Sequence, residues 1–274
     1  MRVLKLGKGT WQLRQVGDEE WLKTSFPGEV HLTLMAAGRI PDPFIADNEL
    51  EVAWVAESDW EFLGVIEVSD DLLAEERVYL QFEGFDTLAQ VAVNGNLLGE
   101  TANAFRVYAW EVKPYLQPGE NEIQIRFHSP VSYVKPMQAA EPLPAPGESL
   151  PGGPYLRKAP CQWGWDWGPK LPPIGIWKEA WLKGFPIAKL DTVHLRQAHQ
   201  FDGSVIVSAE ANLQKWTEAH LQLCLTLRDP EGKTFATSCK FLDGSATAQI
   251  EITDPHLWWP NGYGDQPLYQ AHVS

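Results

Sequence analysis

The segment Leu221-Gln222-Leu223-Cys224-Leu225-Thr226-Leu227 places a leucine at every second position. Successive side chains of a β-strand point to opposite faces of the sheet, so this spacing predicts a strand with one buried face. The same period of two returns along most of the chain, at residues 78–83, 123–128, 205–209 and 246–252. These segments therefore predict half-buried strands of antiparallel sheets.

Turn residues separate the candidate strands, and helical spacing is rare. Asn94-Gly95, Pro118-Gly119 and Glu231-Gly232 are turn signals. Only residues 19–23 and 31–37 show a short helical period. We predict an all-β architecture of sandwiches.

The length of 274 residues suits one large domain or two ordinary ones, at roughly 100–200 residues per domain. Residues 135–154 are rich in proline, glycine and alanine and cannot sustain a strand ladder. They form either an interdomain linker or, as we prefer, a long loop of the first domain, because residues 175–177 and 180–182 resemble a strand that returns to it. We therefore expect one domain at 1–186 and a second at 187–274.

The second domain contains six candidate strands, where an immunoglobulin-like sandwich has about seven. The candidates are residues 190–196, 204–213, 220–228, 234–242, 246–253 and 267–274. Because the sequence stops within the last of these, we expect the domain to lack its final strand and the chain to be a fragment. If Glu231-Gly232 forms a two-residue turn, Cys224 and Cys239 face each other across a hairpin, more plausibly as small buried side chains than as a disulfide.

The composition excludes several classes of partner. A net charge of −14 repels phosphate backbones and anionic lipid surfaces, so neither nucleic acid nor a membrane is expected as a partner. The sequence has no apolar run of about 18 residues and no signal peptide, which favours a cytoplasmic location. The three cysteines and seven histidines show no metal-ligand spacing, and no nucleotide-binding fingerprint is present. We therefore expect no metal and no cofactor.

Tryptophan is the unusual residue, with thirteen in the chain and five between Trp163 and Trp181. In an extended conformation, the indoles of Trp163, Trp165 and Trp167 would point to one side, and the carboxylate of Asp166 to the other. Flat aromatic rings and a fixed carboxylate suit a hydroxyl-rich ligand such as a sugar. Packing of the indoles in the core is the alternative.

Asp166 argues against simple core packing, because a carboxylate among indoles is costly unless it is paired. Arg157 or Lys158, just upstream, is the candidate partner. Glycoside hydrolysis uses two carboxylates that flank the bond, and no such pair is marked in this sequence. We assign no catalytic residue.

The sequence resembles glycoside hydrolase family 2, and within it the β-mannosidases. The segments that carry the resemblance are residues 30–31, 38–44, 47–49, 54–55, 59–60, 82–87, 93–95, 103–105, 157–158, 163–169 and 175–177 in the first domain, and 256–264 and 266–269 in the second. Ile40-Pro41-Asp42-Pro43-Phe44 and Trp165-Asp166-Trp167-Gly168-Pro169 are the segments most specific to β-mannosidases.

The resemblance implies a jelly-roll sugar-binding domain, then an immunoglobulin-like domain, then a (β/α)₈ barrel that carries both catalytic glutamates of a retaining mechanism. Such a barrel needs about 250 residues, which this sequence does not contain. By the same resemblance, Asp166, with Trp165 and Trp167, binds the sugar at the barrel mouth. A second family-matched group is either structural or close to the substrate: Asp47, Asn48 and Glu49, to which we add Arg157 and Lys158.

We therefore expect the non-catalytic N-terminal region of a retaining β-mannosidase, which hydrolyses non-reducing terminal β-D-mannose. Its partners would be a β-mannoside or manno-oligosaccharide and the catalytic barrel of the same polypeptide. A free-standing carbohydrate-binding module is the first alternative, and a fragment of a β-galactosidase or β-glucuronidase is the second.

Overall fold

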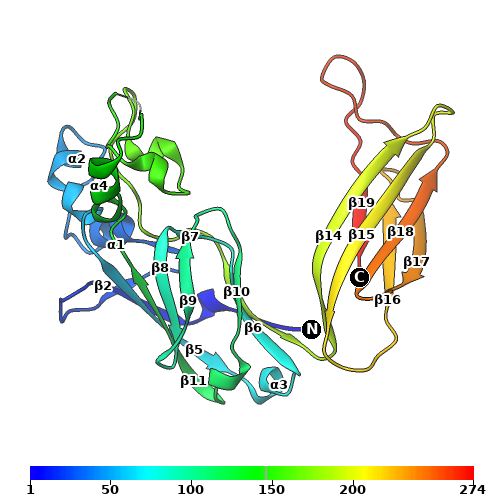
Figure 1. Ribbon diagram of the computed structural model, residues 1–274, viewed down its shortest axis with the longest axis horizontal. Helices are drawn as coiled ribbons and strands as arrows, with labels where there is room; N and C mark the ends of the chain where they lie inside the picture. Colours follow the sequence, from blue (N-terminus) through cyan, green and yellow to red (C-terminus); the bar gives the residue numbers. More distant parts are fainter. Residues whose placement is uncertain (146) are drawn as a thin grey trace. The chain divides into compact units, whose positions relative to one another are not determined.

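Strands dominate the computed structural model, which describes residues 1–145 and 147–274 (Figure 1). The chain divides into unit 1, Met1–Phe185, and unit 2, Pro186–Ser274. Each unit is built from antiparallel sheets. The predicted period of two is the period at which side chains are buried, for example along Gly119–Phe127.

Unit 1 is a sandwich of a six-stranded and a four-stranded sheet with a small third sheet. The six-stranded sheet has the order β3-β2-β5-β11-β8-β9, the four-stranded sheet β1-β13-β6-β10, and the small sheet β4-β12-β7. The strands are β1 (Arg2–Lys5), β2 (Thr10–Gln15), β3 (Leu22–Thr24), β4 (Gly28–Glu29), β5 (Trp60–Val68), β6 (Arg77–Phe82), β7 (Phe85–Asp86), β8 (Leu88–Val93), β9 (Asn96–Ala102), β10 (Tyr108–Glu111), β11 (Gly119–Phe127), β12 (Gly175–Ile176) and β13 (Ala180–Phe185). The segments at 175–177 and 180–182 do return to this sandwich, since β13 lies between β1 and β6.

Aromatic side chains fill the space between the two large sheets. Phe127 is fully buried, with ring centroids 5.4 Å from Phe62 and 6.0 Å from Phe85. The ring centroids of Phe82 and Phe85 are 4.5 Å apart. Burial of such rings is the main source of stability in a sandwich of this size.

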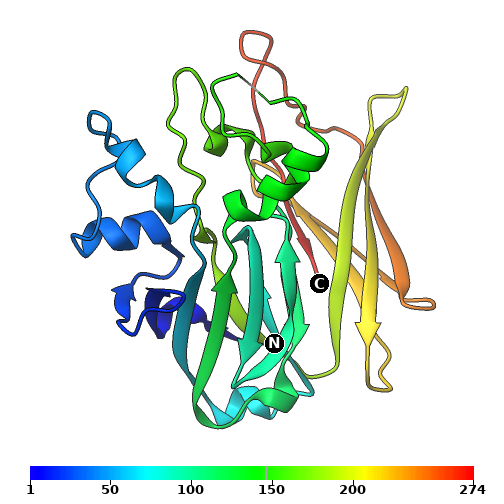
Figure 2. The ribbon, with the colours of Figure 1, turned by 60° about the vertical axis from the view of Figure 1, so that its left-hand side comes forward.

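α1, α2 and α4 lie toward one end of unit 1, and α3 lies toward the other (Figures 1 and 2). The helices are α1 (Val30–Ala36), α2 (Asn48–Glu51), α3 (Asp70–Leu73) and α4 (Pro130–Ala140), with short 3-10 turns η1 (Leu6–Lys8), η2 (Ala53–Val55), η3 (Lys113–Tyr115), η4 (Gly153–Tyr155) and η5 (Pro160–Trp163). α1 confirms the helical period at residues 31–37. Its N-terminus is capped by Glu29, whose carboxylate accepts a hydrogen bond from the amide of Leu32.

Two local predictions are wrong. Residues 19–21 are irregular and residues 22–23 begin β3, because Leu22 pairs with Leu13 on β2 and this pairing overrides a weak helical period. Residues 135–140 are the second half of α4, which the Ser129 side chain caps and in which Pro130 takes the first position. The rest of the 135–154 segment is mostly irregular, and Pro146 lies outside the described residues.

Unit 2 is a sandwich of two three-stranded sheets, β14-β15-β18 and β17-β16-β19. Its strands are β14 (Ala188–His199), β15 (Val205–Lys215), β16 (Gln222–Arg228), β17 (Thr234–Lys240), β18 (Ser245–Ile252) and β19 (Gln270–Val273). Each overlaps one of the six candidate strands. Leu223, Leu225 and Leu227 of the opening motif are buried between the sheets, and Leu221 before them is half-buried. A further strand of this sandwich stays a prediction.

The two cysteines of the β16–β17 hairpin do not face each other. Cys224 pairs with Ser238, and Cys239 pairs with Leu223, so the two thiols point to opposite faces of the sheet. The register differs from the predicted one because the turn is longer: a backbone hydrogen bond joins the Asp229 amide to the Lys233 carbonyl. Both thiols are free.

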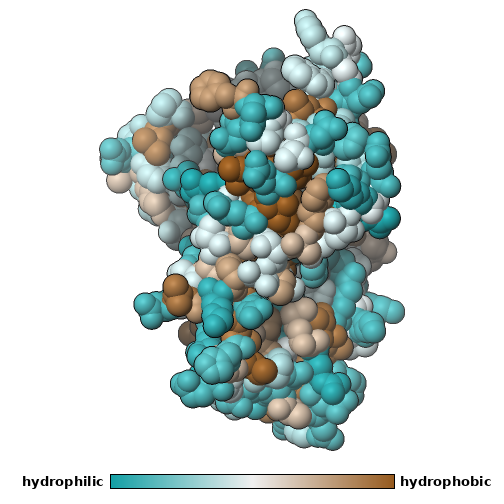
Figure 3. Space-filling view, turned by 90° about the vertical axis from the view of Figure 1, so that its right-hand side faces the viewer, coloured by the Kyte–Doolittle hydropathy of each residue, from teal (hydrophilic) through white to brown (hydrophobic). Residues whose placement is uncertain are grey.

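Apolar side chains also reach the surface, in patches ringed by hydrophilic ones (Figure 3). In unit 2 a hollow of about 500 Å³ is lined by apolar residues, among them Leu195, Leu227, Trp258 and Trp259. No helix in the described parts of the chain is long and apolar enough to cross a membrane.

We predict that Phe127→Ala lowers the free energy of unfolding of unit 1 by about 3–5 kcal/mol, because it leaves a cavity beside the rings of Phe62 and Phe85. Phe201→Ala, at a fully exposed ring in unit 2, is the matched control and should change stability by less than about 0.5 kcal/mol. Denaturant titration of each variant measures both values. An equal effect of the two substitutions would contradict this packing.

Candidate functional site

The segment that carries the tryptophans is folded into turns. Residues Pro160–Trp163 form η5, and Gly164 then adopts a φ of +97°. Trp165 and Gly168 close a tight turn through two backbone hydrogen bonds of 3.1 and 3.4 Å. The prediction of an extended segment is therefore wrong, because the glycine takes a left-handed conformation that interrupts it.

The three indoles consequently separate into two environments. Trp163 is 2% exposed and packs with Leu88, Val134 and Leu156. Trp165 and Trp167 are 37% and 79% exposed, and their ring centroids are 5.0 Å apart. Core packing thus describes Trp163, whereas the other two indoles are open to solvent and available to a ligand.

Asp166 lies at the tip of this turn, between the two exposed indoles, and is itself exposed. Within residues 1–145 and 147–274 its carboxylate forms no hydrogen bond and no ion pair. The predicted pairing of Asp166 with Arg157 or Lys158 is wrong. Arg157 is exposed, and Lys158 has a different partner.

The partner of Lys158 is Asp86, on β7. The Lys158 ammonium, with a fully buried side chain, lies 2.6 Å from Asp86 Oδ1. It also donates a hydrogen bond of 2.7 Å to the carbonyl of Pro173. Asp86 is 6% exposed in its side chain and accepts further hydrogen bonds from the Thr87 hydroxyl and from Gln162 Nε2.

This ion pair ties together both stems of the loop at residues 159–173. Lys158 precedes the loop, Pro173 ends it, and Gln162 lies within it. β12, which follows the loop, pairs with β7 at Gly175 and Asp86. The buried Asp86–Lys158 ion pair, with its hydrogen bonds to Pro173 and Gln162, is called the clamp below. The clamp fixes the loop that carries the turn at Trp165–Trp167 to the sandwich.

Glu29 lies beside the same stems. Its carboxylate contacts His31 Nδ1 at 2.8 Å and accepts hydrogen bonds from the amides of Leu32 and Ile174. Burial raises the pKa of Glu29, but the hydrogen bond and charge of His31 outweigh it and hold this pKa below its ordinary value. Burial lowers the pKa of Lys158, and the Asp86 carboxylate opposes this shift only in part.

A cavity of about 360 Å³ opens beside the clamp. It is lined by Glu29, Asp86 and Gln162 and by the half-exposed ring of Trp177. The indole of Trp177 donates a hydrogen bond to the carbonyl of Ala104. Sequence reasoning placed Asp86 and Trp177 in family-matched segments but gave neither a role.

The second predicted cluster serves the local structure of α2. Asn48 Nδ2 donates a hydrogen bond of 2.8 Å to the carbonyl of Asp42, and Asp47 is exposed at the start of the helix. Glu49 is half-buried in the first turn. Among the described side chains, no hydrogen bond or ion pair joins this cluster to the Trp165–Trp167 turn. Three or more His, Cys, Asp or Glu side chains that could hold a metal do not come together anywhere in the described residues.

A β-sandwich that presents exposed indoles and a free carboxylate, followed by a second sandwich, is an arrangement suited to carbohydrate recognition. The family model described as glycosyl hydrolase 2 galactose-binding domain-like matches residues 11–178, and that of glycosyl hydrolases family 2 matches residues 188–274. This chain belongs to glycosyl hydrolases family 2. The predicted family and the predicted order of its two β domains are confirmed.

Known relatives share this region over its whole length. Beta-mannosidase B from Emericella nidulans is 34% identical over 279 residues, which cover 96% of this chain and 32% of the relative. The crystal structure of a β-D-mannosidase from Dictyoglomus thermophilum matches with a TM-score of 0.91 and 34% identity, over all of this chain and 34% of that one. An exo-chitosanase from Amycolatopsis orientalis, at a TM-score of 0.69 and 16% identity, shares the fold. The chain spans about a third of the length of the curated relatives it matches.

We predict that Lys158→Met destabilises unit 1 by about 3–5 kcal/mol, because it leaves the Asp86 carboxylate buried without its counterion. Arg157→Met is the matched control at the exposed neighbouring position and should cost less than about 0.5 kcal/mol. Thermal and denaturant unfolding of the two variants give the comparison. Equal stability of Lys158→Met and the unmodified chain would show that the ion pair is not a structural clamp.

Proposed function

We propose that this chain is the N-terminal sugar-binding region of a retaining β-mannosidase and that Asp166 binds the non-reducing terminal β-D-mannose of the substrate. The observation that carries the proposal is the exposed carboxylate of Asp166, which forms no hydrogen bond or ion pair within the described residues and is flanked in the sequence by the exposed residues Trp165 and Trp167. The relatives that share a third of its residues are β-mannosidases by name, which supports the choice of sugar.

The chemistry of the turn suits a pyranose ring. A carboxylate has two oxygens that accept hydrogen bonds from a pair of neighbouring hydroxyl groups, and such charge-assisted bonds contribute about 1.5–3 kcal/mol each. Indole faces cover the C–H patches of a sugar. The rings of Trp165 and Trp167 pack against each other, with centroids 5.0 Å apart and planes tilted by 42°, and both are partly open to solvent.

The clamp supports this function by fixing the loop before the sugar arrives. A loop that is already ordered loses little conformational entropy on binding, so more of the interaction energy appears as affinity. Lys158 and Asp86 are positioning residues in this proposal, since their atoms are buried and reach the sugar only through the loop.

Catalysis belongs, in this proposal, to a (β/α)₈ barrel elsewhere in the same polypeptide. The chain corresponds to about a third of its relatives, which leaves ample length for a barrel of about 250 residues. None of the residues named above is given the role of acid, base or nucleophile. The substrate is a β-mannoside or manno-oligosaccharide.

We predict that Asp166→Ala in the full-length protein lowers kcat/KM for an aryl β-mannoside by at least about tenfold, which corresponds to the loss of one charge-assisted hydrogen bond. Asp18→Ala, at another exposed aspartate of unit 1, is the control and should leave kcat/KM unchanged.

The 274-residue chain carrying Asp166→Ala should melt at the temperature of the unmodified chain, because this carboxylate forms no hydrogen bond or ion pair with another described residue. An unchanged kcat/KM in a well-folded Asp166→Ala protein would rule out the binding role.

A further inference from the structure

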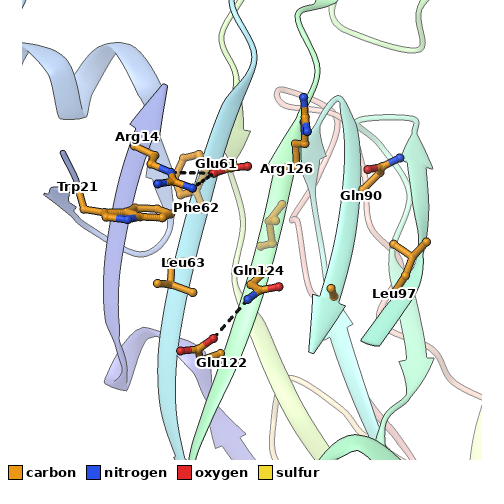
Figure 4. A pocket seen from close by; sticks show the side chains of 12 residues that line it. Arg14, Trp21, Glu61, Phe62, Leu63, Gln90, Leu97, Glu122, Gln124 and Arg126 are labelled. Atoms are coloured by element: carbon orange, nitrogen blue, oxygen red, sulfur yellow. Dashed lines mark hydrogen bonds and ion pairs between the residues drawn. The ribbon is translucent and has the colours of Figure 1, made fainter. Parts of the chain in front are cut away.

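The outer face of the six-stranded sheet in unit 1 carries a hollow of about 380 Å³ that the proposed function does not use (Figure 4). Its lining comes from β2, β5, β8, β9 and β11 together with Trp21. None of these residues belongs to the Trp165–Trp167 turn or to its clamp. The volume falls in the range of about 300–1,000 Å³ that is typical of small-molecule sites.

The hollow forms because short side chains lie beside long ones on adjacent strands. Gln124 on β11 is paired with Ala92 on β8 and with Leu63 on β5, and all three side chains point away from the core. The short side chain of Ala92 lies at the bottom of the hollow, and longer side chains such as Trp21 and Leu97 form its walls. Figure 4 shows Trp21 at one end and Leu97 at the other.

The wall at the Trp21 end is fixed by ionic and aromatic contacts. Arg14 donates to Glu61 Oε2 over distances of 2.7 and 2.8 Å, and its guanidinium lies 4.4 Å from the centre of the Trp21 ring. Arg14, Trp21 and Glu61 are all half-buried. These side chains are therefore held in place without a ligand, which lowers the entropy cost of binding one.

The charges that line the hollow are balanced, although the chain as a whole carries −14. Arg14 and Arg126 offset Glu61 and Glu122. Gln90 and Gln124 add amides, whose Nε2 atoms donate to Glu100 and Glu122 and whose oxygens can accept hydrogen bonds from a ligand. Balanced charge with many donors and acceptors suits an uncharged ligand with many hydroxyl groups.

A protein partner fits this lining less well. The centres of protein interfaces are enriched in aromatic residues and arginine and are depleted in lysine and acidic residues. The hollow has Trp21 and two arginines, but two glutamates and two glutamines also stand around its apolar floor. An aromatic ring, planar guanidinium groups and amides around a shallow hollow are instead the groups that recognise sugar rings and their hydroxyls.

We propose that this hollow is an oligosaccharide-binding site, which takes an uncharged, hydroxyl-rich chain of sugar units across β5, β11 and β8. Trp21 stacks on one sugar ring, and Gln124 and Gln90 exchange hydrogen bonds with hydroxyl groups. The partly open setting keeps water in competition with the ligand, so we expect weak, saturable binding.

The test is a titration of the 274-residue chain with β-1,4-linked mannotriose, followed by isothermal calorimetry and by amide chemical shifts. The chain carries Asp166→Ala throughout, which weakens binding at the turn of the proposed function, and the chemical shifts then locate the remaining binding. We expect saturable binding, with the largest shifts on β5, β8 and β11. A negatively charged sugar, trigalacturonate, should bind more weakly than mannotriose.

Two variants locate the site in that background. Ala92→Phe fills the hollow without removing a hydrogen-bonding group, and Trp21→Ala removes the aromatic wall. Each should weaken binding by at least about tenfold, as expected for a central contact of a binding site. Ala109→Phe, the same substitution at an exposed strand position of the other large sheet, is the control and should leave binding unchanged.

Several results would overturn the proposal. They are no saturable binding of mannotriose, shifts that map away from these strands, or equal affinity in Ala92→Phe. Concentration-dependent self-association that Ala92→Phe abolishes, and with which mannotriose does not compete, would assign the hollow to a second copy of the chain instead. The kcat/KM of Asp166→Ala in the full-length protein tests the proposed function, whereas mannotriose binding to the 274-residue chain tests the hollow. Either proposal can therefore fail without the other.

Discussion

The buried ion pair between Asp86 and Lys158 determines where the candidate sugar-binding turn lies. Removing two charges from water costs several kcal/mol per ion, and only close pairing with further hydrogen bonds offsets that cost. The structure provides these partners: the carbonyl of Pro173 for the ammonium, and Thr87 and Gln162 for the carboxylate. Pro173 and Gln162 belong to the loop at 159–173, and Thr87 directly follows β7, the strand that carries Asp86.

That arrangement explains how a loop with little regular structure can present a binding surface. The rigid part is the sandwich, whose aromatic core fixes β7 and β12. The ion pair carries this rigidity to the loop stems, and the Trp165–Gly168 hydrogen bonds fix the tip. Trp163 faces inward and anchors the middle of the loop, while Trp165 and Trp167 face outward. Trp163 thus stabilises the loop from inside, while Trp165 and Trp167 remain exposed for binding a ligand.

The fold was predictable where one interaction dominates. A period of two along residues 221–227 or 123–128 reflects burial on one face of a sheet, and burial determines the strand. Prediction failed where a local feature competed with long-range contacts. Leu22 and Lys23 pair with β2 despite the helical spacing of residues 19–23. The proline-rich segment begins as a helix because Ser129 caps it and Pro130 takes its first position.

The sequence predicted which residues lie at the candidate site, but it did not predict that Lys158 pairs with Asp86. Asp166, Trp165 and Trp167 stand out by composition, and Lys158 was noted as a possible counterion. Its true partner, Asp86, is distant in the sequence, and no local pattern indicates which carboxylate a buried lysine meets. The extended conformation assumed for 163–167 failed at Gly164, where a positive φ redirects the chain. A glycine such as Gly164 permits a turn, but the sequence alone does not determine which conformation the glycine takes.

The central claim is that the Asp86–Lys158 pair holds the loop in place, and hydrogen–deuterium exchange tests it most directly. The comparison is between the unmodified chain and Asp86→Asn, which keeps the shape of the side chain and removes its charge. We expect the amides of Gln162, Trp165 and Gly168 to exchange at least about tenfold faster in the variant, while the central strands β5 and β11 stay protected. Unchanged exchange of the loop in a variant that has lost the ion pair would contradict it.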